Sequence, residues 1–523
     1  MFNLKKTPLD NISFFEHSNH HCLLNNISRG IERECLRINP DGFIAQTKHP
    51  PSLGASLTNP FITTDFSESM IEFITPVFNT PKKLIKFLND LHVFTVKNIG
   101  EEQLWPLSMP CLQEKQHIPI ADYGNSNNGK FKKLYRIGLH HRYGSNMQTI
   151  SGIHYNFSMP KEFWPAYHSH LKSRKSIKDF KSECYLNLIR NVHQYGWLIS
   201  YLFGASPSVC PHFISSKEQA EKMLLSENYK NLYLPYATSL RMSHLGYQNK
   251  ASTQIAICHR NLDNYVEDLR LAVQTKDPNW EKLGIFQNGN RIQISDSILQ
   301  IENEYYSSIR PKRKTLPNER PTTALLKRGV EYVEFRNVDI NPFFAIGIGE
   351  SQVKFLDIFL TWCLLRKSLS CNHETQTHQK YNQEMVVLSG RTKDLTLQSE
   401  KKEIKLVDWA LEIFEELKII SILFNKATDD EYSETLKLYK TYLHNPEKTY
   451  SALLLKETLQ ESLLQLGLDK SNLYKNYFLQ QKLTDDMHKI FTTAAIDSFN
   501  FQEKMEMGDT ETFEDYINNY FEN

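Results

Sequence analysis

The sequence predicts an α+β protein in which a sheet domain over residues 1–350 is followed by a mainly helical portion over residues 351–523 that packs on it. Two observations predict this class. Before residue 350, four segments alternate polar and apolar residues with the period of a β-strand. After residue 350, apolar residues recur at helical spacing, and the sequence shows no regular strand–helix alternation of the kind that builds parallel sheets.

The four alternating segments each place ionisable side chains on one face of a strand and apolar side chains on the other. The segments are GIERECLRIN, SMIEFITP, ISGIHYNFSM and EYVEFRNVDI, which lie far apart in the chain. If they pair in one sheet, their polar residues converge on one surface. These residues are Glu32, Glu34, Glu72, His154, Glu334 and Arg336.

A single glutamate on a strand is ordinarily part of a solvated outer face, but the same arrangement in four segments favours a functional surface. Crowded carboxylates repel one another and resist burial, so we expect divalent cations to neutralise them. Sites rich in oxygen ligands suit Mg²⁺ or Mn²⁺ better than Zn²⁺. Carboxylate-held Mg²⁺ commonly binds substrate phosphates, which makes a phosphate-containing substrate the expected partner.

The remaining elements follow from capping and periodicity. Thr80 and Pro81 are typical of a helix start, and Gly100 follows the end of that helix. Along the chain we then expect hydrophilic loops over 115–145, helices near 179–203, further strand structure over 285–306 and a strand over 330–341. Beyond the turn at Gly347 and Gly349 we expect helices over 353–367 and 404–424, with a polar surface excursion over 371–403.

Composition excludes several classes of protein. The 61 Lys and Arg residues against 60 Asp and Glu residues create no basic field for nucleic acid. The 8 cysteines lie at irregular spacings without a Cys-x-x-Cys pair, which argues against a zinc ribbon or a dense disulfide framework and leaves their pairing open. The start of the chain has no signal-peptide pattern, and no apolar stretch is long enough to span a bilayer, so we expect a cytoplasmic protein without a membrane partner.

Long motifs in the first two thirds of the chain resemble the proteobacterial type of the glutamate–cysteine ligase family. They include GIERECLRIN, TTDFSESMIEFITP, MQTISGIHYNFS, LPYATSLRMSHLGY, LQIENEYYSSIRPKR and EYVEFRNVDINPF, and they cover roughly residues 28–345. The resemblance implies a glutamine-synthetase-like antiparallel catalytic sheet that forms a funnel. ATP would enter from one side and amino acids from the other, with Mg²⁺ or Mn²⁺ between them.

The resemblance also implies a reaction and residue roles. An ATP-dependent ligase would join the γ-carboxyl of L-glutamate to the amine of L-cysteine through a γ-glutamyl phosphate, with inhibition by glutathione. Arg336 would bind the phosphoryl group and the γ-carboxyl. Together with Glu334, on the same strand face, it would form the catalytic pair. The implied metal ligands are Glu32, Glu34, Asp65, Glu72, His154 and Glu334.

The expected amine pocket contains one arginine and several aromatic residues. Arg241 suits the cysteine carboxylate because a guanidinium can donate two parallel hydrogen bonds. The residues that match the family's pocket positions are Phe66, Tyr135, Gln148, Tyr247 and Tyr306. Lys312 and Arg313 form a basic cluster that is either a solvated loop or a phosphate-binding group.

Three other functions stay open at this point. A related carboxylate–amine ligase would have the same metal-binding groups but another amine acceptor. A metal-dependent hydrolase would act without ATP, and a non-catalytic binding module would turn over no ATP.

Overall fold

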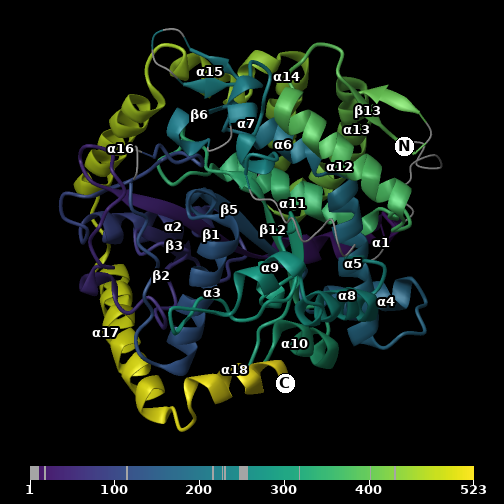
Figure 1. The fold of residues 1–523 in the computed structure, drawn as a ribbon. Helices are drawn as coiled ribbons and strands as arrows, with labels where there is room; N and C mark the ends of the chain where they lie inside the picture. The colour runs from purple at the N-terminus through teal and green to yellow at the C-terminus, as the bar shows by residue number, and fades with distance from the viewer. Residues whose placement is uncertain are drawn as a thin grey trace.

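The computed structural model describes residues 11–16, 19–112, 116–214, 217–226, 228, 231–246, 257–316, 318–400, 402–428 and 431–522. Figure 1 shows the strands in the middle of the molecule, the green helices α11 to α14 above and to the right, and the yellow helices α17 and α18 along the lower left and bottom. The α+β class is confirmed. The boundary near residue 350 stays a prediction, because one apolar core contains residues from Ile12 to Phe491.

The centre of the fold is a seven-stranded sheet in the order β11-β12-β5-β1-β3-β2, with β4 paired to β1. Every pairing in it is antiparallel. The four alternating segments are therefore confirmed as neighbouring strands. The strands are β1 (Ser28–Ile38), β2 (Ile62–Thr64), β3 (Met70–Ile74), β4 (Gln103–Leu104), β5 (Gly152–Ser158), β11 (Ile309–Lys312) and β12 (Tyr332–Asp339).

The register of the sheet places the polar residues beside one another. Glu32 on β1 is opposite His154 on β5, and Glu34 on β1 is opposite Glu72 on β3. Glu334 on β12 pairs with Asn156 on β5. Because side chains directly opposite each other in a sheet share a face, the alternation in sequence becomes one polar surface in space.

Helices cover the opposite, apolar face of the sheet. Ile31, Tyr155 and Phe335 are fully buried there in the main core. The helices that pack around this core are α2 (Pro81–Val96), α5 (Ile177–Tyr195), α11 (Glu350–Leu365), α13 (Leu406–Ala427) and α14 (Tyr432–His444). Thr80 caps α2 as expected, since its side chain accepts a hydrogen bond from the Lys83 amide.

The other elements surround this centre. The helices are α1 (Ser13–Glu16), α3 (Asn127–Tyr143), α4 (Phe163–His170), α6 (Trp197–Phe203), α7 (Lys217–Glu221), α8 (Leu262–Gln274), α9 (Pro278–Leu283), α10 (Pro321–Arg328), α12 (His373–Ser389), α15 (Tyr450–Thr458), α16 (Leu463–Gln480), α17 (Asp485–Gly508) and α18 (Phe513–Glu522). The short strands are β6 (Ser208–Val209), β7 (Leu224–Leu225), β8 (Leu232–Tyr233), β9 (Phe286–Gln287), β10 (Asn290–Arg291), β13 (Thr396–Gln398) and β14 (Glu403–Lys405).

The prediction of loops over 115–145 is wrong for the second half of that range, where α3 forms. Ser126 caps α3 by accepting a hydrogen bond from the Gly129 amide. Phe131 and Leu134 are buried, but Lys132, Tyr135 and other polar residues face a cavity. A helix with a polar cavity on one side lacks the apolar periodicity by which amphipathic helices are recognised.

One further prediction is corrected. The range 285–306 forms only short elements, namely the two-residue strands β9 and β10 and a 3-10 turn over Glu302–Glu304, and its alternating apolar residues, such as Ile294 and Ile301, are buried without a continuing ladder. The range 371–403, predicted as a polar surface excursion, forms α12 and most of the β13–β14 hairpin. Asn372 caps α12, and Asn382 and Val386 anchor its buried side.

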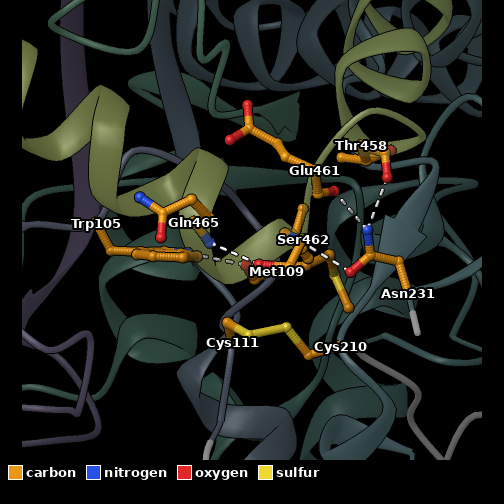
Figure 2. Close-up of a disulfide and its surroundings, with 10 residues drawn as sticks. Trp105, Met109, Cys111, Cys210, Asn231, Thr458, Glu461, Ser462 and Gln465 are labelled. Atoms are coloured by element: carbon orange, nitrogen blue, oxygen red, sulfur yellow. Dashed lines mark hydrogen bonds between the residues drawn. A yellow bond between two sulfur atoms is a disulfide. The ribbon is translucent and has the colours of Figure 1, made fainter. Parts of the chain in front are cut away.

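A disulfide between Cys111 and Cys210 joins chain segments 99 residues apart (Figure 2). The Trp105 indole nitrogen donates a hydrogen bond to the Met109 carbonyl at 2.9 Å and holds the loop before Cys111. This indole packs against Gly467 of α16, where a Cβ would lie 2.0 Å from a ring carbon. Closing so long a loop restricts the unfolded chain and stabilises the fold. Cysteine pairing, open from the sequence, is decided here for these two residues.

Every helix in the described part of the chain is too short or too polar to cross a membrane.

Candidate active site

A cavity of about 830 Å³ opens over the polar face of the sheet, and we call it the central cavity. The strands β1, β3, β5 and β12 and the loop after β2 all contribute to its walls. All the residues predicted as metal ligands line it: Glu32, Glu34, Asp65, Glu72, His154 and Glu334. The sequence therefore brought these side chains to one surface as expected, and their role as ligands stays a prediction.

His154 lies at the centre of the acidic group. Its Nδ1 atom is 3.2 Å from a Glu32 oxygen and 3.5 Å from a Glu334 oxygen, and its Nε2 atom is 3.5 Å from a Glu34 oxygen. Glu32, Glu72 and His154 each offer a ligand atom within 4.8 Å of the other two. This spacing matches donors that converge on one ion rather than side chains that point apart.

The carboxyl groups of the acidic group differ in the direction of their pKa shifts. Burial, followed by the neighbouring carboxylates, raises the pKa of Glu72 well above its usual value. Burial also raises the pKa of Glu34. Burial opposes ionisation of Glu334 too, but the charges of Lys312 and Arg336 outweigh it and lower that pKa well below its usual value. Neighbouring positive charge thus outweighs burial at Glu334 but not at Glu34.

The donor set fits a hard divalent cation. Carboxylate oxygens outnumber the single imidazole, and among the described residues that line the cavity there is no cysteine. Such oxygen-rich sets suit Mg²⁺ or Mn²⁺, and a bound cation would relieve the repulsion that raises the pKa of Glu72.

Arg336 occupies the same strand face as Glu334 and lines the central cavity. Its Nη1 atom donates a hydrogen bond to a Glu334 oxygen at 3.3 Å. Its guanidinium lies 5.8 Å from the centre of the Tyr306 ring. Burial would lower the pKa of Arg336, but Glu334 and further groups raise it, so the side chain stays charged. Its Nε atom is buried without a hydrogen-bond partner, which leaves a donor for a substrate oxygen.

Most of the predicted amine-pocket residues also line the cavity: Phe66, Tyr135, Gln148 and Tyr306. Phe66 is 1% exposed and belongs to a separate apolar cluster with Leu139 and Leu240. Tyr247 lies outside the described residues.

Arg241 lies beneath the cavity and does not line it. The side chain is 1% exposed, its Nη1 atom is 3.5 Å from an Asp339 oxygen, and its Nη2 atom donates to the Arg336 carbonyl at 3.0 Å. Asp339 in turn accepts hydrogen bonds from Ser206 and Ser239. This network joins Arg241 to the strand that carries Arg336.

The two residues of the basic cluster point to different sides of the chain. Lys312, on β11, lines the cavity with its Nζ atom 3.5 Å from a Glu334 oxygen. Arg313 does not line it: its Nη1 atom donates to the Arg328 carbonyl at 3.0 Å, and its Nε atom is 3.6 Å from a Glu331 oxygen. Consecutive residues of an extended chain point to opposite sides, so only one of them can face the cavity.

Sequence reasoning missed a second group of cations in the cavity. Lys132 and Arg136 line it from α3, and Arg310 and Lys314 line it from the region of β11. Burial, followed by the charge of Arg136, lowers the pKa of Lys132 to about 8. The basic run FKKLYR was the available signal, but it lies in the range 115–145, for which the sequence predicts hydrophilic loops.

Comparison with known proteins agrees with this geometry. The family model "Glutamate-cysteine ligase" matches residues 12–386. A glutamate–cysteine ligase of Alcanivorax borkumensis is 43% identical over 518 residues, which is 96% of this chain and 98% of that protein. The chain is therefore similar to its relative over nearly the whole length of both.

Solved structures give the same result. A glutamate–cysteine ligase from Francisella tularensis in complex with AMP superposes with a TM-score of 0.89 and 36% identity, over 95% of this chain and 98% of that one. A bifunctional glutathione synthetase from Pasteurella multocida has a TM-score of 0.70 and 23% identity, over 91% of this chain and 57% of that one, and shows the fold alone. The glutamine-synthetase-like fold class is thereby confirmed, and the chain belongs to the glutamate–cysteine ligase family.

Proposed function

We propose that the enzyme joins L-glutamate to L-cysteine in the central cavity at the expense of ATP, which is the first step of glutathione biosynthesis. A carboxylate is a poor electrophile, so an oxygen of the glutamate γ-carboxyl first attacks the terminal phosphorus of ATP and ADP leaves. The cysteine amine then attacks the carbonyl carbon of this γ-glutamyl phosphate, the bond from that carbon to the phosphate oxygen breaks, and a proton leaves the amine. The products are γ-glutamylcysteine, ADP and phosphate.

One observation supports this proposal most strongly. A sheet face rich in carboxylates shares one cavity with Arg336 and with a set of lysines. A phosphoryl transfer requires little covalent chemistry from the protein but demands positioning and neutralisation of charge. The cavity contains groups for both tasks.

The residues of the cavity have distinct roles in this proposal. Glu32, Glu34, Asp65, Glu72, His154 and Glu334 would hold Mg²⁺, or Mn²⁺, between nucleotide and amino acids. When bound, the ions neutralise the phosphate oxygens of ATP. Arg336 donates hydrogen bonds to the transferring phosphoryl group and the γ-carboxyl, and Glu334 holds the guanidinium at 3.3 Å. Lys132 and Lys312 bind the phosphates as point charges.

The part of the cavity around Phe66, Gln148 and Tyr306 suits a small amino acid. Phe66 and Tyr306 offer apolar surface to the cysteine side chain, while Gln148 offers an amide to its polar groups. The hydroxyl of Tyr306 lies 3.4 Å from the sulfur of Met242, which places a second polarizable atom near the expected position of the thiol.

The test is product formation by the purified protein with ATP, MgCl₂, glutamate and cysteine. We expect cysteine-dependent phosphate release and a γ-glutamyl dipeptide by mass spectrometry. A panel of other amines separates this reaction from that of a related ligase. Phosphate release without any dipeptide would contradict the proposal, as would dipeptide formation that does not require ATP.

Replacing Arg241 by alanine is expected to change the KM values of cysteine and ATP by similar factors and to lower the melting temperature. The reason is that Arg241 is buried against Asp339 and supports the strand that carries Arg336. Steady-state kinetics with each substrate varied in turn check this result. A rise confined to the cysteine KM would instead support the direct carboxylate contact predicted from the sequence.

Glutathione is expected to inhibit the enzyme in competition with glutamate. Glutathione contains a γ-glutamyl group followed by cysteine, so it resembles the product and can occupy the positions of both amino acids. Initial rates at several glutamate concentrations check this prediction, and substitutions near Arg336 should weaken the inhibition. Inhibition that saturating glutamate does not relieve would point to a separate site.

The cytoplasmic location stays a prediction. The Cys111–Cys210 disulfide counts against this location, because stable disulfides are uncommon in reducing compartments such as the cytoplasm.

A further inference from the structure

The last helix of the described chain, α18, lies at one end of the central cavity. Its apolar residues recur at helical spacing on one side: Phe513, Tyr516, Ile517, Tyr520 and Phe521. Tyr516 and Tyr520 line the cavity, although no motif pointed to them. In Figure 1, α17 and α18 run in yellow along the outside of the molecule, and α18 ends below α3 and α10.

Specific contacts hold α18 against the wall of the cavity. The rings of Tyr520 and Tyr516 lie 4.7 Å and 5.8 Å from the Phe131 ring of α3. The Tyr520 hydroxyl donates to a Glu302 oxygen at 3.2 Å, and Arg320 donates to the Phe521 carbonyl at 3.3 Å. Chain ends that are tied down by packing and hydrogen bonds are ordered parts of a fold.

Helix α3 runs along the wall of the cavity. Phe131, Lys132, Tyr135, Arg136 and Tyr143 all line it from this one helix. With a rise of about 1.5 Å per residue, the first and last of these positions lie about 18 Å apart. The contacts of α18 with Phe131 therefore place it at the N-terminal end of α3, next to Lys132. Phe66 of the predicted cysteine pocket belongs instead to the apolar cluster of Leu139, near the C-terminal end of that helix.

The α18 end of the cavity has the chemistry of a site for a planar base. Ile301 lines the cavity and packs in the same apolar cluster as Tyr516 and Tyr520, and Arg320, which precedes the cavity-lining Pro321, lies 5.8 Å from the centre of the Tyr520 ring. Aromatic side chains bind nucleobases through their faces, and the adjacent cations suit the phosphates of the same molecule. Gln148, which follows the C-terminal end of α3 at Tyr143, is assigned to the amino acids in the proposed function.

We infer that α18 forms the base-contacting wall of the nucleotide site, with Tyr516 and Tyr520 against the purine of ATP. This inference rests on the proposed function, since it assumes that ATP occupies the lysine-containing part of the cavity. It assigns a substrate-binding role to the last residues of the chain, which lie far in sequence from every motif of the catalytic sheet.

The test compares nucleotide binding by Tyr516→Ala and Tyr520→Ala with that of the unchanged enzyme. Isothermal titration calorimetry with ADP and MgCl₂ should show affinity losses of about 5- to 100-fold, the range expected for one lost stacking contact. The KM of ATP should rise, while the KM values of glutamate and cysteine at saturating ATP stay within about twofold. Tripolyphosphate, which lacks a base, should bind all variants equally.

Two further variants serve as controls. Tyr520→Phe keeps the ring but loses the hydrogen bond to Glu302, so it should bind ADP nearly as well as the unchanged enzyme and shows whether the loss in Tyr520→Ala comes from the ring. Tyr381→Ala removes a tyrosine that is 42% exposed on α12, away from the cavity, and should leave the ADP affinity and the KM of ATP unchanged.

Two results would overturn the inference without touching the proposed function. One is unchanged ADP binding by both alanine variants in an active ligase. The other is an equal loss of ADP and tripolyphosphate binding, which would mean that α18 shapes the phosphate site. If the unchanged enzyme binds no nucleotide and forms no dipeptide, the proposed function fails and the inference fails with it.

Discussion

Replacing Arg336 by alanine is expected to lower kcat about 10³-fold, because a fixed cation that stabilises charge on a transferring phosphoryl group contributes an effect of this size. The Arg336 guanidinium lines the central cavity, is held by Glu334 at 3.3 Å and retains a buried Nε donor without a protein partner. Steady-state release of phosphate and of dipeptide measures the loss.

The matched control is Arg313→Ala. Arg313 is an arginine of the basic cluster directly after β11, the strand paired with the one that carries Arg336, but its side chain contacts the Arg328 carbonyl and Glu331 instead of the cavity. We therefore expect its kcat to stay within about threefold of the unchanged enzyme. A comparable loss in both variants, or a loss of less than tenfold in Arg336→Ala, would contradict the role given to Arg336.

Replacing Asp357 by alanine is expected to lower the free energy of unfolding by about 3–5 kcal/mol, because it leaves a buried guanidinium without its counter-charge. Arg29 on β1 donates from Nε to both Asp357 oxygens at 2.9 Å. The hydroxyls of Tyr155 and Tyr432 donate to the same carboxylate at 2.7 Å and 2.9 Å. This cluster joins the sheet to α11 and α14 in the core.

Urea unfolding followed by circular dichroism measures this effect. Glu415→Ala is the control, because Glu415 forms an ion pair of 2.8 Å with Lys440 at a site where both side chains are solvent-exposed. Such pairs contribute at most about 1 kcal/mol. If the two substitutions shift the urea midpoint equally, the buried cluster does not stabilise the fold. In Arg29→Met/Asp357→Leu, removal of both charges should recover part of the loss.

The polar face of the sheet could be predicted because its information is local. Alternation with a period of two places Glu32 and Glu34 on one side of a strand whatever lies around it. The pairing of β1 with β3 and β5 then follows from the need to bury Ile31, Phe73 and Ile153 on the other side. The same alternation explains why Lys312 faces the cavity and Arg313 does not, although the sequence alone left their separation undecided.

Other parts of the site could not be predicted, since they depend on neighbours that are distant in sequence. The polar side of α3 resembles a solvated loop until the cavity is known, so Lys132 and Arg136 were missed. Arg241 was expected to face the substrate, whereas the structure pairs it with Asp339 beneath the cavity.

The sequence by itself determined the strands, their acidic face and the family, because these depend on the periodicity and motifs of short segments. Only the tertiary structure decided that Cys111 pairs with Cys210, that cations from α3 join the acidic face, and that Tyr516 and Tyr520 line the cavity. The physical reason is that each of these contacts forms between segments whose distance in space is set by packing of the whole core. A ring contact such as that between Phe131 and Tyr520 leaves no pattern in either segment alone.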